Sequence, residues 1–153
     1  MFMRTMVTTA IALLVTAIFP VWAQETTNTP TVDEIVNQTN HVSYYQGADG
    51  RAKVTMRITD SQGRVREKAF TILRKDKEDQ TDGEQHFYVY FHEPADERGT
   101  VFMVWKHIDK DDDRWLYLPG LDVTKRIAAS DTRTSFVGSH FFYEDVSGRS
   151  LDK

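Results

Sequence analysis

The chain has 153 residues and no cysteine, and its formal net charge at pH 7 is -4. A chain of this length supports one domain of ordinary size, and the lack of cysteine excludes a disulfide framework. The mild acidity argues against a nucleic-acid partner, which needs a basic face, and against tight docking on anionic lipid surfaces.

Residues 1–23 have the features of a secretory signal peptide. Arg4 supplies the positive charge, residues 10–19 form an uncharged run, and Val21 and Ala23 place small residues at a cleavage site. The apolar run is shorter than the about 20 residues that a membrane span needs. We therefore expect cleavage after Ala23, with residues 24–30 as a disordered polar leader of a soluble periplasmic chain. An uncleaved anchor is the less favoured alternative.

The elements predicted for residues 31–153 are one helix followed by strands. Thr31 and Glu34 fit a capping box, and apolar residues at helical spacing predict an amphipathic helix over residues 32–40. Period-two alternation then predicts strands over residues 53–59, 65–73, 86–92, 101–107, 115–118 and 125–128. Residues 74–84 form a charged loop in this interpretation, and Pro119-Gly120 suits the central positions of a type II turn.

This order is typical of a mainly β domain with one N-terminal helix and an antiparallel meander, because no strand-helix-strand alternation is present. Several strands are apolar or aromatic on both faces. Phe87, Val89 and Phe91 point one way, while Tyr88 and Tyr90 point the other way. A sheet with one solvated face would alternate apolar and polar residues, so a helix, a second sheet or a ligand should cover the second face.

No motif for catalysis or metal binding is complete. Asp109, Asp111 and Asp113 imitate the start of a calcium loop, but Arg114 stands where the loop requires glycine. Ser139 and His140 lack the surroundings of a nucleophile elbow. We therefore expect a protein that is not an enzyme and needs neither a cofactor nor a metal ion.

The motifs of residues 90–146 resemble those of a known family. In chain order they are EPA at 93–95, RGT at 98–100, WLYLP at 115–119, KRI at 125–127, FVGS at 136–139 and YED at 143–145. They are similar to the periplasmic outer-membrane lipoprotein-sorting proteins, a branch of the LolA-like superfamily. The predicted helix and first hairpin fit the usual start of these proteins, whose chains continue beyond the point at which this sequence stops.

The resemblance implies a strongly curved antiparallel sheet, an unclosed half-barrel with helices on its concave side. Residues 31–153 would then be the N-terminal portion of a LolA-like domain, truncated at the C-terminus. Relatives bind lipoprotein acyl chains or other lipids in the apolar hollow, and the family has no catalytic residues. Some members of this branch accompany RND-type exporters, which makes such an exporter a candidate partner.

We therefore expect a periplasmic carrier or chaperone for lipid or an acylated lipoprotein. One alternative is a periplasmic sensor or adaptor subunit of a membrane transporter or regulator. Another is a structural β domain whose second face is buried only by its own missing C-terminal part.

Alternation within the strands gives two sets of candidate lining residues, of which one must face the hollow. The first set comprises Val54, Met56, Ile58, Phe70, Ile72, Phe87, Val89, Phe91, Phe102, Val104, Leu116 and Leu118. The opposite set comprises Tyr88, Tyr90, Trp115 and Tyr117. The pattern does not decide which set is concave, and core and cavity lining share one composition.

Overall fold

The computed structural model describes residues 29–77 and 83–149. Contacts divide the chain into Met1–Pro30 and Thr31–Lys153, and every element named below belongs to the second unit. The predicted signal peptide, residues 1–23, and residues 24–28 of the predicted leader lie outside the described residues. Within the described part of the chain, no helix has the length and apolar character needed to cross a membrane.

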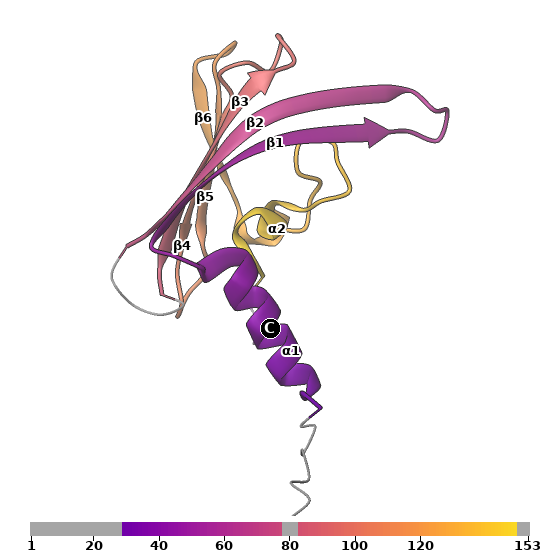
Figure 1. The fold of residues 1–153 in the computed structure, drawn as a ribbon. Helices are drawn as coiled ribbons and strands as arrows, with labels where there is room; N and C mark the ends of the chain where they lie inside the picture. The colour runs from indigo at the N-terminus through magenta and orange to yellow at the C-terminus, as the bar shows by residue number, and fades with distance from the viewer. Residues whose placement is uncertain (1–28, 78–82, 150–153) are drawn as a thin grey trace, which may run out of the picture. The chain divides into compact units, whose positions relative to one another are not determined.

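Six strands form one antiparallel, unclosed sheet in chain order (Figure 1). They are β1 Asp49–Thr59, β2 Val65–Asp76, β3 Gln85–Glu93, β4 Val101–Lys106, β5 Asp113–Leu118 and β6 Val123–Ile127. Each strand pairs with the next one along the chain, as short connections between antiparallel strands allow. The predicted mainly β fold with a curved, unclosed antiparallel sheet is confirmed.

The predicted N-terminal helix is α1, Val32–Asn40, and its capping box is formed. The Thr31 amide donates to Glu34 Oε2 at 2.7 Å, and the Glu34 amide donates to Thr31 Oγ1 at 3.2 Å. Helix α1 continues directly into the π-helix η1, His41–Tyr45. No residue of α1 is buried, and Val32 is 75% exposed. Helix α1 therefore does not plug the concave face, and η1 and the chain after β6 take that position.

The first hairpin is longer than the sequence pattern predicted. Residues 74–76, expected to begin a loop, belong to β2, and Lys75 pairs with Asp49 at the start of β1. The side chain of Arg74 donates to backbone carbonyls of residues 44, 46 and 47. These hydrogen bonds stabilise the pairing of β1 with β2 through residues 74–76, whose charged composition predicts a loop.

The turn between β5 and β6 is not the predicted type II turn. Such a turn needs a positive φ at its third residue, and Gly120 does not have one. Instead the Leu121 amide donates to the Leu118 carbonyl at 3.1 Å, and Asp122 takes the left-handed conformation with φ 48°. Aspartate tolerates this conformation better than most residues. The connection therefore contains four residues, 119–122, and β6 begins at Val123, which pairs with Leu118.

The core lies between the concave face of the sheet and the chain that follows β6. This chain contains the short 3-10 helix η2, Ala129–Asp131, and the short helix α2, Tyr143–Ser147, which lies under the sheet in Figure 1. The buried cluster consists of Phe70, Phe87, Val89, Phe91, Phe102, Val104, Ile127 and Phe136. Each such side chain contributes about 1.5–3 kcal/mol when fully buried, so the cluster dominates the stability of the domain.

Helix α2 ends at Gly148 in a conformation reserved for glycine. Gly148 has φ 83° and ψ 143°, a combination that side chains with a Cβ rarely adopt. A Cβ at this position would lie 2.9 Å from the ring of Tyr44. Gly148 therefore permits close contact between the end of α2 and η1.

We predict that Gly148→Ala destabilises the domain more than Gly63→Ala. Gly63 also has a positive φ, 78°, but nothing lies within 4 Å of the Cβ it lacks. Both variants carry backbone strain of about 1–3 kcal/mol from the positive φ, and Gly148→Ala adds a conformation reserved for glycine and a clash with the Tyr44 ring. Urea unfolding of the two variants measures the difference, and equal losses would show that the contact with Tyr44 contributes nothing.

A charged cluster joins the β2–β3 and β4–β5 ends of the sheet. Glu84 Oε1 lies 2.8 Å from His107 Nδ1, and Asp113 Oδ2 lies 3.1 Å from His107 Nε2. Lys77 Nζ also donates to the Glu84 carboxylate. The hydrogen bonds from Lys77 and His107 lower the pKa of Glu84 from 4.5 to about 2.

This lowered pKa predicts a stability change in acid. Because the pKa is depressed in the folded state, the contribution of Glu84 is complete above pH 4.5 and is lost as pH falls through about 2. Glu84→Gln should therefore be less stable than the unaltered chain at neutral pH, and the gap should narrow as the solution is acidified. Denaturant unfolding across this range tests it, with Glu93→Gln, an exposed carboxylate elsewhere, as the control. A gap independent of pH would contradict the assignment.

Candidate functional site

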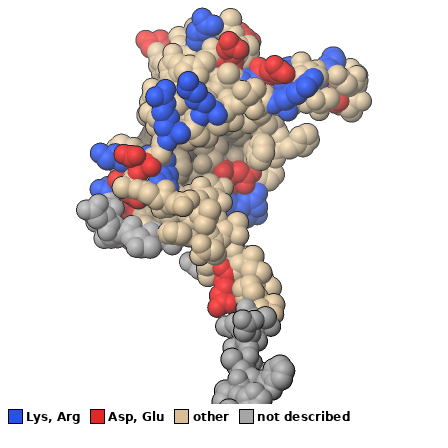
Figure 2. All heavy atoms as spheres, viewed as in Figure 1, with Lys and Arg blue, Asp and Glu red and all other residues tan. Residues whose placement is uncertain are grey.

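A hollow of about 740 Å³ opens on the concave face of the sheet, beside the core. Strands β1, β2 and β3 supply one wall, and η1 and the chain around α2 supply the other. Figure 2 shows the depression between the sheet and the segment below it, with mostly uncharged residues inside. The lining consists of Val42, Ser43, Tyr44, Gln46, Gly50, Arg51, Ala52, Val54, Met56, Phe70, Ile72, Arg74, Phe87, Phe136, Phe141, Asp145 and Val146.

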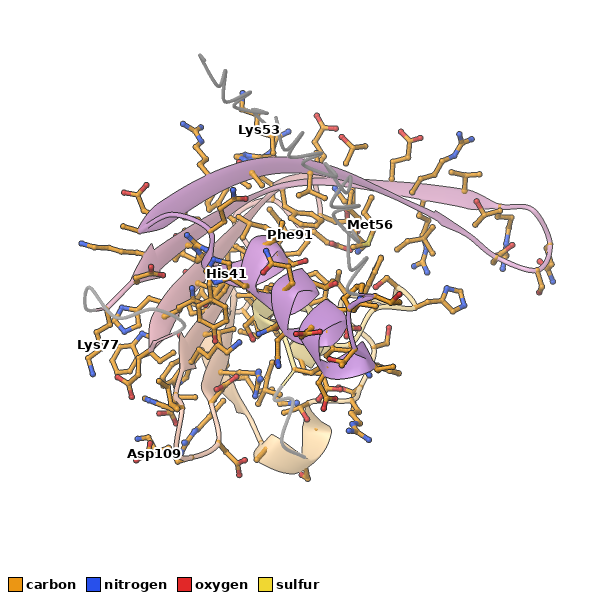
Figure 3. The ribbon with its side chains drawn as sticks, turned by 60° about the horizontal axis from the view of Figure 1, so that its bottom comes forward. His41, Lys53, Met56, Lys77, Phe91 and Asp109 are labelled. Carbon is orange, nitrogen blue, oxygen red and sulfur yellow. The ribbon has the colours of Figure 1, made fainter. Side chains whose placement is uncertain are left out.

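The structure shows that the first predicted set of residues occupies the concave face. Figure 3 shows Met56 and Phe91 on the side of the sheet that faces the C-terminal segment, and Lys53 on the other side. Register agrees, because Val54 pairs with Phe70 and Phe70 pairs with Phe91. Alternation places all other members of each strand's set on the same face.

The first set divides between the hollow and the core. Five of its members line the hollow, namely Val54, Met56, Phe70, Ile72 and Phe87. Four are buried in the core and do not line it, namely Val89, Phe91, Phe102 and Val104. Leu116 packs against the core, and Ile58 and Leu118 are half-buried away from the hollow. Their contact with a ligand remains a prediction, most direct for the five that line the hollow.

The opposite set lies on the convex face. Met103 pairs with Tyr88 on one side and with Trp115 on the other, and Val101 pairs with Tyr90 and Tyr117. Among the described residues neither a helix nor a second sheet covers this face, where Tyr88 is 39% and Trp105 is 50% exposed, and its cover by a ligand remains a prediction. The rings partly cover one another instead, as in the edge-to-face contact of Trp105 with Trp115 at 5.1 Å.

The ring of Phe136 separates the hollow from the core. It is 2% exposed and lies 5.5 Å from the ring of Phe102, 6.1 Å from Phe91 and 6.2 Å from Phe70. Tyr143 of α2 contacts the same ring edge-to-face at 5.6 Å. Phe136 therefore fills the concave face over β2–β4, and the side toward β1 stays open.

A strained turn directs Phe136 into this position. Val137 has φ 47° and Gly138 has φ 80°, and the Ser139 amide donates to the Phe136 carbonyl at 3.0 Å. A positive φ is unusual for a β-branched residue, and such strain persists only where surrounding contacts impose it. Ser139 Oγ donates to the Phe136 carbonyl at 2.8 Å and accepts from the Phe141 amide, so this hydroxyl stabilises the turn.

Polar contacts around Tyr44 close one end of the hollow. The Tyr44 carbonyl accepts from Arg74 and, at 2.8 Å, from Gln85 Nε2. Its hydroxyl donates to the Asp145 carbonyl at 3.0 Å. Burial and the nearby Asp145 carboxylate raise the pKa of the Tyr44 phenol, so the hydroxyl stays protonated as a donor. Lys106, whose ammonium lies 5.6 Å from the Tyr44 ring, donates to the Ser147 carbonyl at 2.7 Å. We call these contacts the Tyr44 clamp.

Sequence reasoning missed the wall opposite the sheet. It comprises Val42, Ser43, Tyr44 and Gln46, together with Phe136, Phe141, Asp145 and Val146 of the C-terminal segment. The FVGSHFF stretch carries three phenylalanines without strand or helix periodicity, and this excess of aromatic residues in a predicted loop was the available signal. No group of metal-ligating side chains occurs among the residues that the structure describes, and the arrangement is suited to holding an apolar molecule.

Comparisons with known proteins agree with this geometry. A family model described as "Uncharacterized protein" matches residues 83–153, and no curated protein matches the chain. A DUF1329 family protein from Desulfovibrio piger ATCC 29098 is 28% identical with a TM-score of 0.64, over 74% of this chain and 47% of its own. A putative outer membrane lipoprotein-sorting protein domain from Vibrio parahaemolyticus is 27% identical with a TM-score of 0.65, over 78% of this chain and 49% of its own. The chain spans about half the length of these solved structures, and the similarity supports a LolA-like fold.

We predict that Phe136→Ala is far more costly than Phe141→Ala. Phe136 is 2% exposed and in contact with three strands, whereas Phe141 is 58% exposed and lines only the open side. Truncating a buried phenylalanine costs about 3–5 kcal/mol, and truncating an exposed one costs much less. Chemical denaturation of both variants tests the division between core and hollow. A similar loss for the two would mean that Phe136 does not hold the core.

Proposed function

We propose that the chain is the ligand-binding part of a periplasmic carrier or chaperone that holds lipid, or the acyl chains of a lipoprotein, in the hollow. The observation that carries the proposal is the open hollow of about 740 Å³ with its mainly apolar lining. Ligand pockets of this size and composition bury most of a small apolar ligand. The likeness to a putative outer membrane lipoprotein-sorting protein domain supports the same class of ligand.

The physical need for such a carrier follows from the cost of exposing acyl chains to water. Each methylene left in water costs about 0.8 kcal/mol, so a pair of long chains costs more than roughly 20 kcal/mol. A protein that moves such a molecule through an aqueous compartment must cover most of this surface. An open sheet with one uncovered apolar wall admits the chain from the side without unfolding the core.

The proposed location is the periplasm. The pattern of residues 1–23 and the likeness to a lipoprotein-sorting domain support an envelope location. In that compartment a carrier receives its ligand from one membrane protein and delivers it to another. An RND-type exporter is the proposed membrane partner.

We predict that Met56→Asp abolishes uptake of a fluorescent fatty-acid probe, while Thr55→Asp leaves it unchanged. Met56 lines the hollow, whereas its neighbour Thr55 is exposed on the convex face. A carboxylate in the apolar wall must stay solvated or paired, and an acyl chain bound there would remove its water. We therefore expect the affinity for the probe to fall by at least about tenfold.

Fluorescence titration with the purified chain measures the affinity, and far-ultraviolet circular dichroism confirms that each variant is folded. Val54→Trp, which fills the hollow without a charge, gives an independent test if Met56→Asp does not fold. Normal probe binding by folded Met56→Asp and Val54→Trp would rule out the hollow as the site.

A further inference from the structure

The polar groups of the hollow gather at one end. The β1 side of the lining runs from Gly50 to Met56, roughly 20 Å at 3.3 Å per residue. Arg74 lies opposite Gly50 in the ladder, and Phe70 lies opposite Val54. Tyr44 and Gln46 of the lining also adjoin Arg74, because their backbone carbonyls accept from its side chain. The hollow therefore has a polar end beside Gly50 and an apolar end beside Met56.

The Arg74 guanidinium carries the charge of the polar end. Its terminal nitrogens donate to the carbonyls of Tyr44 and Gly47, and to that of Gln46 at 3.0 Å. A guanidinium has five N–H donors, so three acceptors leave two donors unused. One of them is Nε, which is buried without an acceptor. The other is on Nη1, which donates only to the Tyr44 carbonyl, so this nitrogen has a donor left for an anionic ligand.

No carboxylate of the described residues neutralises Arg74, since none forms an ion pair with it. Asp145 is the one acidic residue in the described lining. Its two oxygens already accept from Arg149 Nε at 2.9 Å and from the Phe142 amide at 2.7 Å. Lys68, opposite Met56, is paired with Glu97 and does not line the hollow. The uncompensated charge of the hollow is therefore positive and lies at the Arg74 end.

The strand next to Arg74 leaves room for an acceptor. A side chain at position 50 would begin 3.9 Å from Arg74 Nε, and glycine leaves this space empty. Arg51 also borders the hollow, but alternation along β1 directs its side chain to the convex face. Arg74 is thus the cation that a ligand would meet at this end.

We propose that the hollow selects amphiphiles with an anionic head group, a carboxylate or a phosphate, which accepts from Arg74 while the apolar tail runs along β1 toward Met56. This inference rests on the proposed function and adds the chemical class of the ligand. Charge-assisted hydrogen bonds from a guanidinium are the strongest type available to such a head group. The polar end fixes the orientation of the ligand, and the apolar end accommodates tails of different length.

The test compares two ligands with the same tail, palmitate and hexadecanol, at neutral pH. Each is titrated against the unaltered chain, Arg74→Gln, Arg74→Lys and Lys53→Gln. Lys53→Gln removes one positive charge from the convex face (Figure 3) and controls for the overall charge of the protein. The unaltered chain and Lys53→Gln should bind palmitate about tenfold more tightly than hexadecanol, or better. Arg74→Gln should lose this preference, and Arg74→Lys should keep part of it.

The ratio of the two affinities separates head-group recognition from the role of Arg74 in holding η1. Damage to η1 alone would weaken both ligands equally and leave the ratio unchanged, which would overturn the inference. Equal binding of palmitate and hexadecanol by the unaltered chain would also overturn it while leaving the proposed function intact. Failure of the unaltered chain to bind either ligand would reject the proposed function and, with it, this inference. A second pair, hexadecyl phosphate and inorganic phosphate, shows whether the anion is recognised as part of an amphiphile, and tight binding of inorganic phosphate alone would contradict that.

Discussion

The position of the Phe136 ring determines how the concave face is divided. This ring packs on Phe70, Phe91 and Phe102 of three different strands and on Tyr143 of α2, with centroid distances of 5.5 to 6.2 Å. Because it fills the centre of the face, the residues behind it form a buried core, and the β1 side keeps an uncovered apolar wall. The packing of the core and the shape of the binding surface therefore both depend on the position of one aromatic ring, which the strained turn at Val137 helps to direct.

At the end of the hollow beside Tyr44, polar rather than apolar contacts hold η1 and α2 against the sheet. Arg74 and Gln85 reach the carbonyl of Tyr44, and Lys106 reaches that of Ser147, so the sheet binds both η1 and α2 through backbone acceptors. Buried polar groups stabilise a fold only when they are satisfied, and most of these donors are. Arg74, which lines the hollow, is the exception because two of its five donors have no acceptor, and a guanidinium with an unused donor is suited to an anionic ligand.

Local patterns predicted the strands well and the site only in part. The cap at Thr31 and the period of the strands are properties of adjacent residues, and alternation correctly grouped Val54, Met56 and Phe70 on one face. The position of Phe136 decides whether a residue of the concave face lines the hollow or is buried in the core. Phe136 lies in the segment after β6, whose sequence has no periodicity that predicts this position. Residues 42–46 were missed because the bonds that hold them come from Arg74 and Gln85, far along the chain.

The central claim is that an acyl chain occupies the concave hollow and not the exposed aromatic convex face. Photo-crosslinking with a diazirine-bearing fatty acid, followed by peptide mass spectrometry, tests it most directly because the adduct marks the contact. We expect adducts on the walls of the hollow, at Met56, Ile72 and Phe141, and expect excess unlabelled fatty acid to suppress them. Adducts concentrated instead on the convex residues Tyr88 and Trp105, with the hollow unlabelled, would contradict the account.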